Sequence, residues 1–100
     1  MQVIPIQPIP SQKFAVTLAN QPCRIWLYTR TTGLYCDLYI NDVLAIGGVP
    51  CLNTVLIVRD QYLGFVGDLA LFDLQGNSDP DWIGLGSRYV LLYLDTWDLP

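Results

Sequence analysis

Apolar and polar residues alternate with a period of two along most of the chain, which is typical of β-strands whose two faces differ. The alternating runs are separated by turn-forming residues at 20–22, at Asn41-Asp42, at Gly47-Gly48 with Pro50, and at 75–81. Strands are expected at 13–18, 23–30, 34–41, 43–46, 55–59, 67–74 and 88–95. The pattern predicts an all-β fold, a small antiparallel β-sandwich or a partly open barrel of six to seven short strands.

The segments 23–30 and 34–41 form the clearest predicted hairpin. Each has one aliphatic face, carried by Cys23, Ile25 and Leu27 in the first and by Leu34, Cys36, Leu38 and Ile40 in the second. When the two strands pair, the aliphatic residues of one must lie on the same face of the sheet as those of the other, because a slip of one residue turns every core side chain of a strand to the opposite face. Pairs whose residue numbers sum to 63 or 65 meet this condition and give a loop of two or four residues within 31–34, with Gly33 available for a positive φ.

The opposite face of this hairpin is aromatic and polar. It carries Trp26, Tyr28, Tyr35 and Tyr39, flanked by Arg24, Arg30 and Asp37. Tryptophan, tyrosine and arginine are enriched at the energetic centres of protein interfaces, and flat rings also stack on sugars. Two interpretations stay open: a recognition surface, or a face packed beneath another sheet or a loop.

The two ends of the chain are expected to differ from its middle. Residues 1–12 contain Pro5, Pro8 and Pro10, which predict an extended arm that clamps a surface or a partner. Residues 13–95 form the predicted β domain, and its last strand is apolar on both faces, which suggests a central position. The tail, 96–100, retains Trp97, a residue typical of interface anchors.

Composition favours a protein that assembles with others. Hydrophobic residues make up 52% of the 100 residues and charged residues only 14%, so apolar surface should remain exposed and invite permanent contacts, self-association included. The net charge is −4 and the five cations are scattered, which argues against nucleic acid. No apolar run is long enough to span a membrane, and the start lacks the features of a signal peptide, so the protein is expected to remain in the cytoplasm where it is synthesised until it assembles.

Catalytic chemistry finds little support in the residues. Histidine is absent, which removes the usual general base, the common nucleophile pairs and the commonest metal ligand. The cysteines, at 23, 36 and 51, are interpreted as small buried residues. Neither an aspartate pair for glycoside hydrolysis nor the spacing of a calcium loop stands out around Asp79 and Asp81. We expect no enzyme, no catalytic or metal-ligating residues and no cofactor.

Three stretches of the chain resemble the baseplate plug proteins of contractile-tailed bacteriophages, cyanophages among them. They are IPIQPIPSQKFAVTL, GDLALFDLQGNSDPDW and LGSRYVLLYL, and the similarity extends from Ile4 to Leu94. Its marks are Ile9-Pro10 with Phe14, and then, in order, Gly67-Asp68-Leu69, Gly76, Asp79-Pro80, Leu85-Gly86 and Tyr93. The cysteines and the crowded aromatic residues of 23–41 match no feature of that family.

The resemblance implies a virion protein, a β-rich plug or connector that stabilises the tail baseplate through contacts with other baseplate and tail proteins. The expected interface residues are Trp26, Tyr28, Tyr35, Tyr39, Trp97, Pro5, Pro8 and Pro10. The alternative function is a carbohydrate-binding module that uses the same aromatic face. In that case sugars would change the tryptophan fluorescence, and Trp26→Ala would abolish the change.

Overall fold

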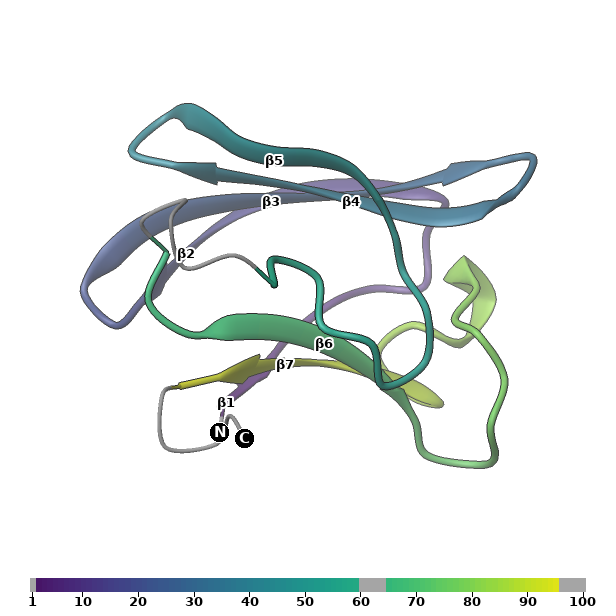
Figure 1. Ribbon diagram of the computed structural model, residues 1–100. Helices are drawn as coiled ribbons and strands as arrows, with labels where there is room; N and C mark the ends of the chain where they lie inside the picture. The colour runs from purple at the N-terminus through teal and green to yellow at the C-terminus, as the bar shows by residue number, and fades with distance from the viewer. Residues whose placement is uncertain (1, 60–64, 96–100) are drawn as a thin grey trace.

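Two antiparallel sheets packed face to face make up the protein in a computed structural model that describes residues 2–59 and 65–95 (Figure 1). The larger sheet has the order β2-β3-β4-β5 and the smaller one the order β1-β7-β6. The strands are β1 (Gln2–Ile4), β2 (Ser11–Leu18), β3 (Gln21–Arg30), β4 (Gly33–Ile40), β5 (Val43–Pro50), β6 (Asp68–Asp73) and β7 (Tyr89–Leu94), with a short 3-10 helix η2 (Trp82–Gly84) before β7. The prediction of a small all-β sandwich is confirmed.

The β3–β4 hairpin has one of the two predicted registers. Its pairs run from Cys23 opposite Ile40 to Arg30 opposite Gly33, and every pair sums to 63, so the loop has two residues. Gly33 has a φ of +134°, as its position beside the loop predicted. The other two hairpins of this sheet close through residue pairs with positive φ, Ala19-Asn20 and Asn41-Asp42. The first turn therefore precedes the expected position at 20–22, and Pro22 lies within β3.

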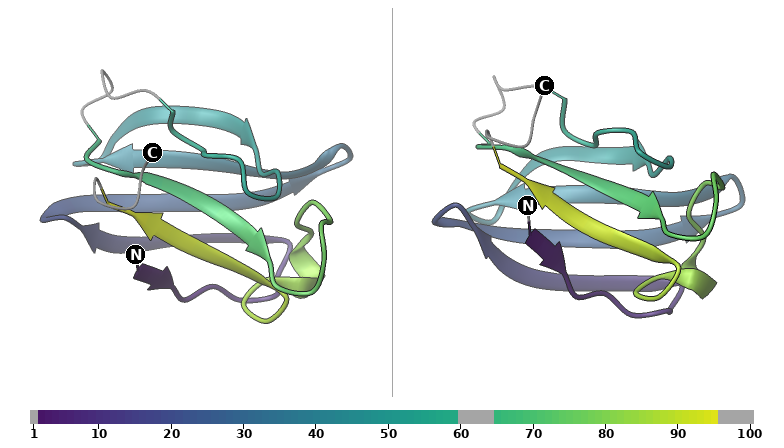
Figure 2. Two further views of the ribbon diagram at one scale, coloured as in Figure 1. Left: turned by 60° about the horizontal axis from the view of Figure 1, so that its bottom comes forward. Right: turned by 90° about the horizontal axis from the view of Figure 1, so that it is seen from below.

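The core fills the space between the two sheets. Figure 2 shows the smaller sheet lying across the face of the larger one. Side chains from the aliphatic face of the large sheet, such as Ile25 and Leu38, are fully buried, as are Leu69 and Leu91 from the small sheet. The two sheets thus bury their apolar faces against each other, which is the main source of stability in such a sandwich. The aliphatic face predicted for the β3–β4 hairpin is the face that enters the core.

The expected strand at 55–59 is wrong, because the backbone of this segment bonds to a buried carboxylate instead of to a full ladder. Asp68, only 3% exposed, accepts hydrogen bonds from the amides of Ile57, Val58, Arg59 and Leu69 at 2.6–3.2 Å. Thr54 and Arg59 have positive φ, which a regular strand does not allow. Two further bonds, from the amides of Thr54 and Ile57 to the carbonyls of Leu71 and Leu69, lay the segment along the edge of β6.

The expectation that Gly47-Gly48 and Pro50 would end the strand starting at Val43 is also wrong. β5 continues to Pro50 because two register shifts absorb extra residues against β4. Gly47 and Gly48 together lie opposite Asp37, and the amide of Gly48 donates to the Asp37 carboxylate at 2.7 Å. The glycines therefore form a bulge whose free amide is satisfied by a side chain.

β7 lies between β1 and β6, which confirms the predicted central position of the last strand. Its inward residues Leu91 and Tyr93 are buried, whereas Val90 and Leu92 on the other face are half-buried. After β1 the chain turns away and enters β2 at Ser11. No helix among residues 2–59 and 65–95 is long and apolar enough to cross a membrane.

Candidate functional site

The aromatic face predicted for the β3–β4 hairpin lies on the outside of the large sheet, away from the small sheet. Its four rings, Trp26, Tyr28, Tyr35 and Tyr39, are each half-buried. The other sheet packs against the aliphatic face instead. We call the outer surface formed by Lys13, Arg24, Trp26, Tyr28, Arg30, Tyr35, Asp37 and Tyr39 the aromatic–cation face.

Three rings of the aromatic–cation face, those of Trp26, Tyr28 and Tyr35, form a row across two strands. The centroids of Trp26 and Tyr28 are 4.7 Å apart with the rings tilted, and those of Tyr28 and Tyr35 are 6.0 Å apart with the rings stacked. Tyr28 and Tyr35 also lie directly opposite in the β3–β4 ladder. Such pairs hold aromatic side chains in fixed orientations and stabilise the ladder.

Cations lie over these rings. The Lys13 ammonium is 4.8 Å from the centre of Trp26 and 5.7 Å from that of Tyr39, and the Arg30 guanidinium is 5.0 Å from that of Tyr28. Rings and cations attract each other through the negative charge of the ring face. The surface therefore presents positive charge supported by an aromatic layer, in a protein whose net charge is negative.

A buried carboxylate orients the centre of this face. Asp37 is 9% exposed and accepts a hydrogen bond from the Tyr28 hydroxyl at 2.8 Å as well as the one from Gly48. Burial, together with the bond to Asp37, raises the pKa of the Tyr28 hydroxyl above its ordinary value. Tyr28 thus stays protonated and remains a donor at neutral pH. The contact links the aromatic row to the bulge in β5.

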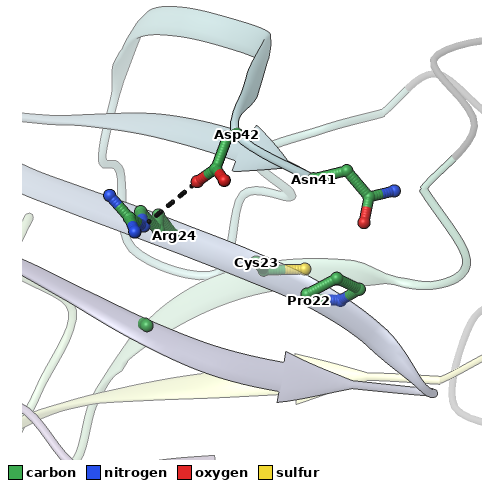
Figure 3. Close-up of a pocket in the computed structure, with 6 residues that line it drawn as sticks. Pro22, Cys23, Arg24, Asn41 and Asp42 are labelled. Carbon is green, nitrogen blue, oxygen red and sulfur yellow. Dashed lines mark ion pairs between the residues drawn. The ribbon is translucent and has the colours of Figure 1, made fainter.

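The face continues into two shallow hollows at the end of the sheet near the β4–β5 turn. One, of about 290 Å³, is lined by Lys13, Arg24, Tyr39 and Asp42. The second, of about 410 Å³, is shown in Figure 3 and shares Arg24 and Asp42 with the first. The exposed Arg24 and Asp42 form an ion pair at 3.3 Å across the rim. These hollows are suited to receiving side chains of a partner.

The other predicted interface residues lie apart from this face. Pro5, Pro8 and Pro10 are exposed in the connection between β1 and β2, and Trp97 lies outside the described residues. Sequence analysis missed Lys13 as part of the face. Its position at the start of the predicted strand 13–18, on the face opposite Phe14 and Val16, was the available signal. Placing it over Trp26 requires the β2–β3 register.

Other reactive or ionisable side chains, the three cysteines and the Asp73–Arg88 pair, have structural surroundings. Cys23, Cys36 and Cys51 are all free and buried, as expected, and hydrogen bonding to Cys51 raises the pKa of the Cys36 thiol well above its ordinary value. Within the 73–88 connection, Arg88 forms two hydrogen bonds with the Asp73 carboxylate, at 2.8 and 2.9 Å. No group of three or more potential metal-ligating side chains occurs among the residues that the structure describes.

Fold and surface define a small β-sandwich whose prominent surface is a flat aromatic–cation face, a form suited to binding another macromolecule. A protein-family model described as the cyanophage baseplate Pam3 plug gp18 matches residues 1–96. The chain belongs to this family of phage baseplate plugs, so it is a structural protein of the virion with a place among other baseplate proteins. A search of curated proteins finds no match.

Proposed function

We propose that this protein stabilises the baseplate as a non-catalytic plug by binding neighbouring baseplate proteins through its aromatic–cation face. The single observation that carries the proposal is the layer of Lys13 and Arg30 over the rings of Trp26 and Tyr28 on an uncovered sheet face. Interfaces are enriched in these residue types, and a rigid aromatic base loses little entropy on binding.

The charge of the face indicates the chemistry of its partner. Of the five cations, Lys13, Arg24 and Arg30 lie here. Asp37 is buried beneath the rings, and Asp42 is paired with Arg24. A neighbouring surface with acidic side chains and apolar groups matches this arrangement, because carboxylates pair with the cations while apolar groups contact the ring edges beside them.

The proline residues and the tail supply further contacts in this proposal. Pro5, Pro8 and Pro10 are exposed and have no amide to donate, so the segment 5–10 offers a stiff surface that is available to a partner. Trp97 adds an anchor at the other end of the chain. Sugar stacking, the alternative use of the aromatic face, needs open ring faces, whereas cations lie over Trp26, Tyr28 and Tyr39.

Phage particles complemented with variant plugs test this function. Trp26→Ala combined with Arg30→Ala should leave the sandwich folded, because both side chains lie outside the core. We expect the amount of plug retained in purified particles, measured by quantitative mass spectrometry, to fall at least roughly tenfold, since truncating a central anchor commonly costs about 2 kcal/mol or more.

A matched control uses an apolar residue that is exposed elsewhere. Leu74→Ala alters a side chain that is 63% exposed beyond the end of β6, and particles should retain this variant at the normal level. Equal retention of the double variant and of the unmodified chain would contradict the proposed role of the aromatic–cation face. Circular dichroism of the purified variants verifies that each has folded.

A further inference from the structure

The edge strand β2 has the features of an unprotected pairing edge. It pairs with β3 along its whole length of eight residues without a register shift, and it contains no proline. Lys13 is its single charged residue, and the Lys13 ammonium lies over Trp26 and Tyr39 on its own sheet. Proteins commonly block sheet edges with bulges, prolines or projecting charges, because free edges recruit other strands.

The other three sheet edges are blocked in the described parts of the chain. β5 carries two register shifts and ends at Pro50. β6 is covered by the segment that bonds Thr54 and Ile57 to it. β1 has three residues and is followed by Pro5. Among the sheet edges that the structure describes, β2 is therefore the one that lacks such a block.

The register determines which backbone groups of β2 point outward. The two-residue turn at Ala19-Asn20 makes Leu18 and Gln21 a hydrogen-bonded pair, so bonded and non-bonded pairs alternate from there. Pro22, which has no amide, lies opposite Thr17 in a non-bonded pair, as this assignment requires. The amides and carbonyls that face away from β3 belong to Ser11, Lys13, Ala15 and Thr17. Within residues 2–59 and 65–95, no backbone bond outside the sheet ladders reaches them.

We propose that β2 pairs with β2 of a second copy across a two-fold axis, joining two large sheets into one. The antiparallel pairing centred on Phe14 sets outward-pointing residues opposite each other: Ser11 opposite Thr17, and Lys13 opposite Ala15. Each such pair closes two hydrogen bonds. No like charges meet, because Lys13 faces a small neutral residue.

The same register suits the side chains on the inner face. Phe14 lies opposite Phe14 of the copy, and Val16 lies opposite Gln12. Phe14 and Val16 are only half-buried in the single chain, although both pack against the core. Pairing therefore covers apolar groups that one chain leaves partly exposed. It leaves the rings of the aromatic–cation face free, because the contact is made at the edge strand that carries Lys13.

Sedimentation velocity of the purified chain over a range of concentrations tests the pairing. A single strand pair buries less than a standard interface, so we expect a reversible dimer weaker than roughly 1 µM. Ala15→Pro removes an outward amide but no bond to β3, and it should weaken dimerisation at least tenfold. A chain that stays monomeric up to about 1 mM would overturn the proposal.

Charge substitutions at Ala15 test the register itself. Ala15→Glu places a carboxylate opposite Lys13 of the copy and should tighten the dimer roughly threefold, whereas Ala15→Lys places two ammonium groups together and should weaken it by a similar factor. Combining Lys13→Glu with Ala15→Lys should restore dimerisation. Equal effects of both signs at Ala15, or the absence of restoration, would contradict this register.

Two controls separate pairing from folding. Ala15 lies opposite Arg24 in its own sheet, so thermal unfolding of each variant measures the charge effect within the single chain. Val43→Glu and Val43→Lys make the same charge changes at a residue that is 67% exposed on β5, and neither should alter the dimer.

Discussion

At the scale of single residues, Asp68 shows how one buried side chain determines the path of a connection. Its carboxylate accepts four backbone amides, three of them from the segment 57–59. That segment carries the chain between the two sheets, and its Ile57 and Val58 belong to the core. Burial of this carboxylate is tolerated because backbone amides of the described residues donate hydrogen bonds to both of its oxygens.

Replacing Asp68 by asparagine should lower the free energy of unfolding by about 1–3 kcal/mol. An amide group has one acceptor oxygen, so at least one of the four amides loses its partner or meets a second donor. Chemical denaturation measures the change. Asp42→Asn alters an exposed carboxylate paired with Arg24 and should stay within about 0.5 kcal/mol of the unmodified chain. Equal effects of the two substitutions would contradict the role given to Asp68.

Gly33 provides a second test at this scale. A Cβ at this residue would meet no atom within 4 Å, so any cost of Gly33→Ala arises from the backbone alone. With φ at +134°, that cost should be about 1–3 kcal/mol, measured as a lower unfolding midpoint in urea. Gly76→Ala, at a residue without positive φ and with ordinary contacts, should change stability by less than about 1 kcal/mol. A neutral Gly33→Ala would contradict the observed turn geometry.

At the scale of elements, the connection between β6 and β7 depends on an ion pair. Hydrogen bonding from Arg88 is the main reason that the pKa of Asp73 lies well below its ordinary value near 4. Because the folded-state pKa is lowered, the pair stabilises the protein fully above about pH 4, and this contribution is lost as the pH falls further.

Arg88→Gln should therefore reduce the dependence of stability on pH in the acid range. We expect the unmodified chain to lose stability from pH 5 to pH 2 more steeply than the variant, as measured by urea unfolding at each pH. The two chains should differ most above about pH 4 and converge in acid. A constant difference across this range would show that the Asp73–Arg88 pair does not act through charge.

Elements dominated by local alternation could be predicted from the sequence, and those that depend on distant partners could not. Parity narrowed the β3–β4 register to two candidates, because Ile25 and Leu38 had to share a face, and the structure has one of them. The failure at 55–59 has the opposite cause. Its apolar residues indicate a strand, but the Asp68 carboxylate that binds its amides lies about ten residues further along the chain.

The same distinction applies to the candidate site. The aromatic rings on β3 and β4 were placed on one face by period-two alternation alone. Their cation layer was not predicted, because Lys13 reaches Trp26 only through the β2–β3 pairing. Gly47 and Gly48 were wrongly expected to end β5, for a related reason. They form a bulge whose free amide, that of Gly48, donates to the buried Asp37 carboxylate on the neighbouring strand.

At the scale of the whole molecule, the sandwich separates the buried core from the surface proposed to bind neighbours. The apolar faces of both sheets are buried in one core, while cations and aromatic rings gather on the outer face of the larger sheet. In the proposed function, the plug holds its neighbours without rearranging its own core. A rigid two-layer β fold with a preformed face meets that requirement.

A reconstruction of the intact phage tail is the most direct test of the central claim. It should show this chain in the baseplate with Trp26, Tyr28 and Arg30 buried against a neighbouring baseplate protein that supplies acidic side chains. A baseplate in which the chain is present but its aromatic–cation face is open to solvent would contradict the account.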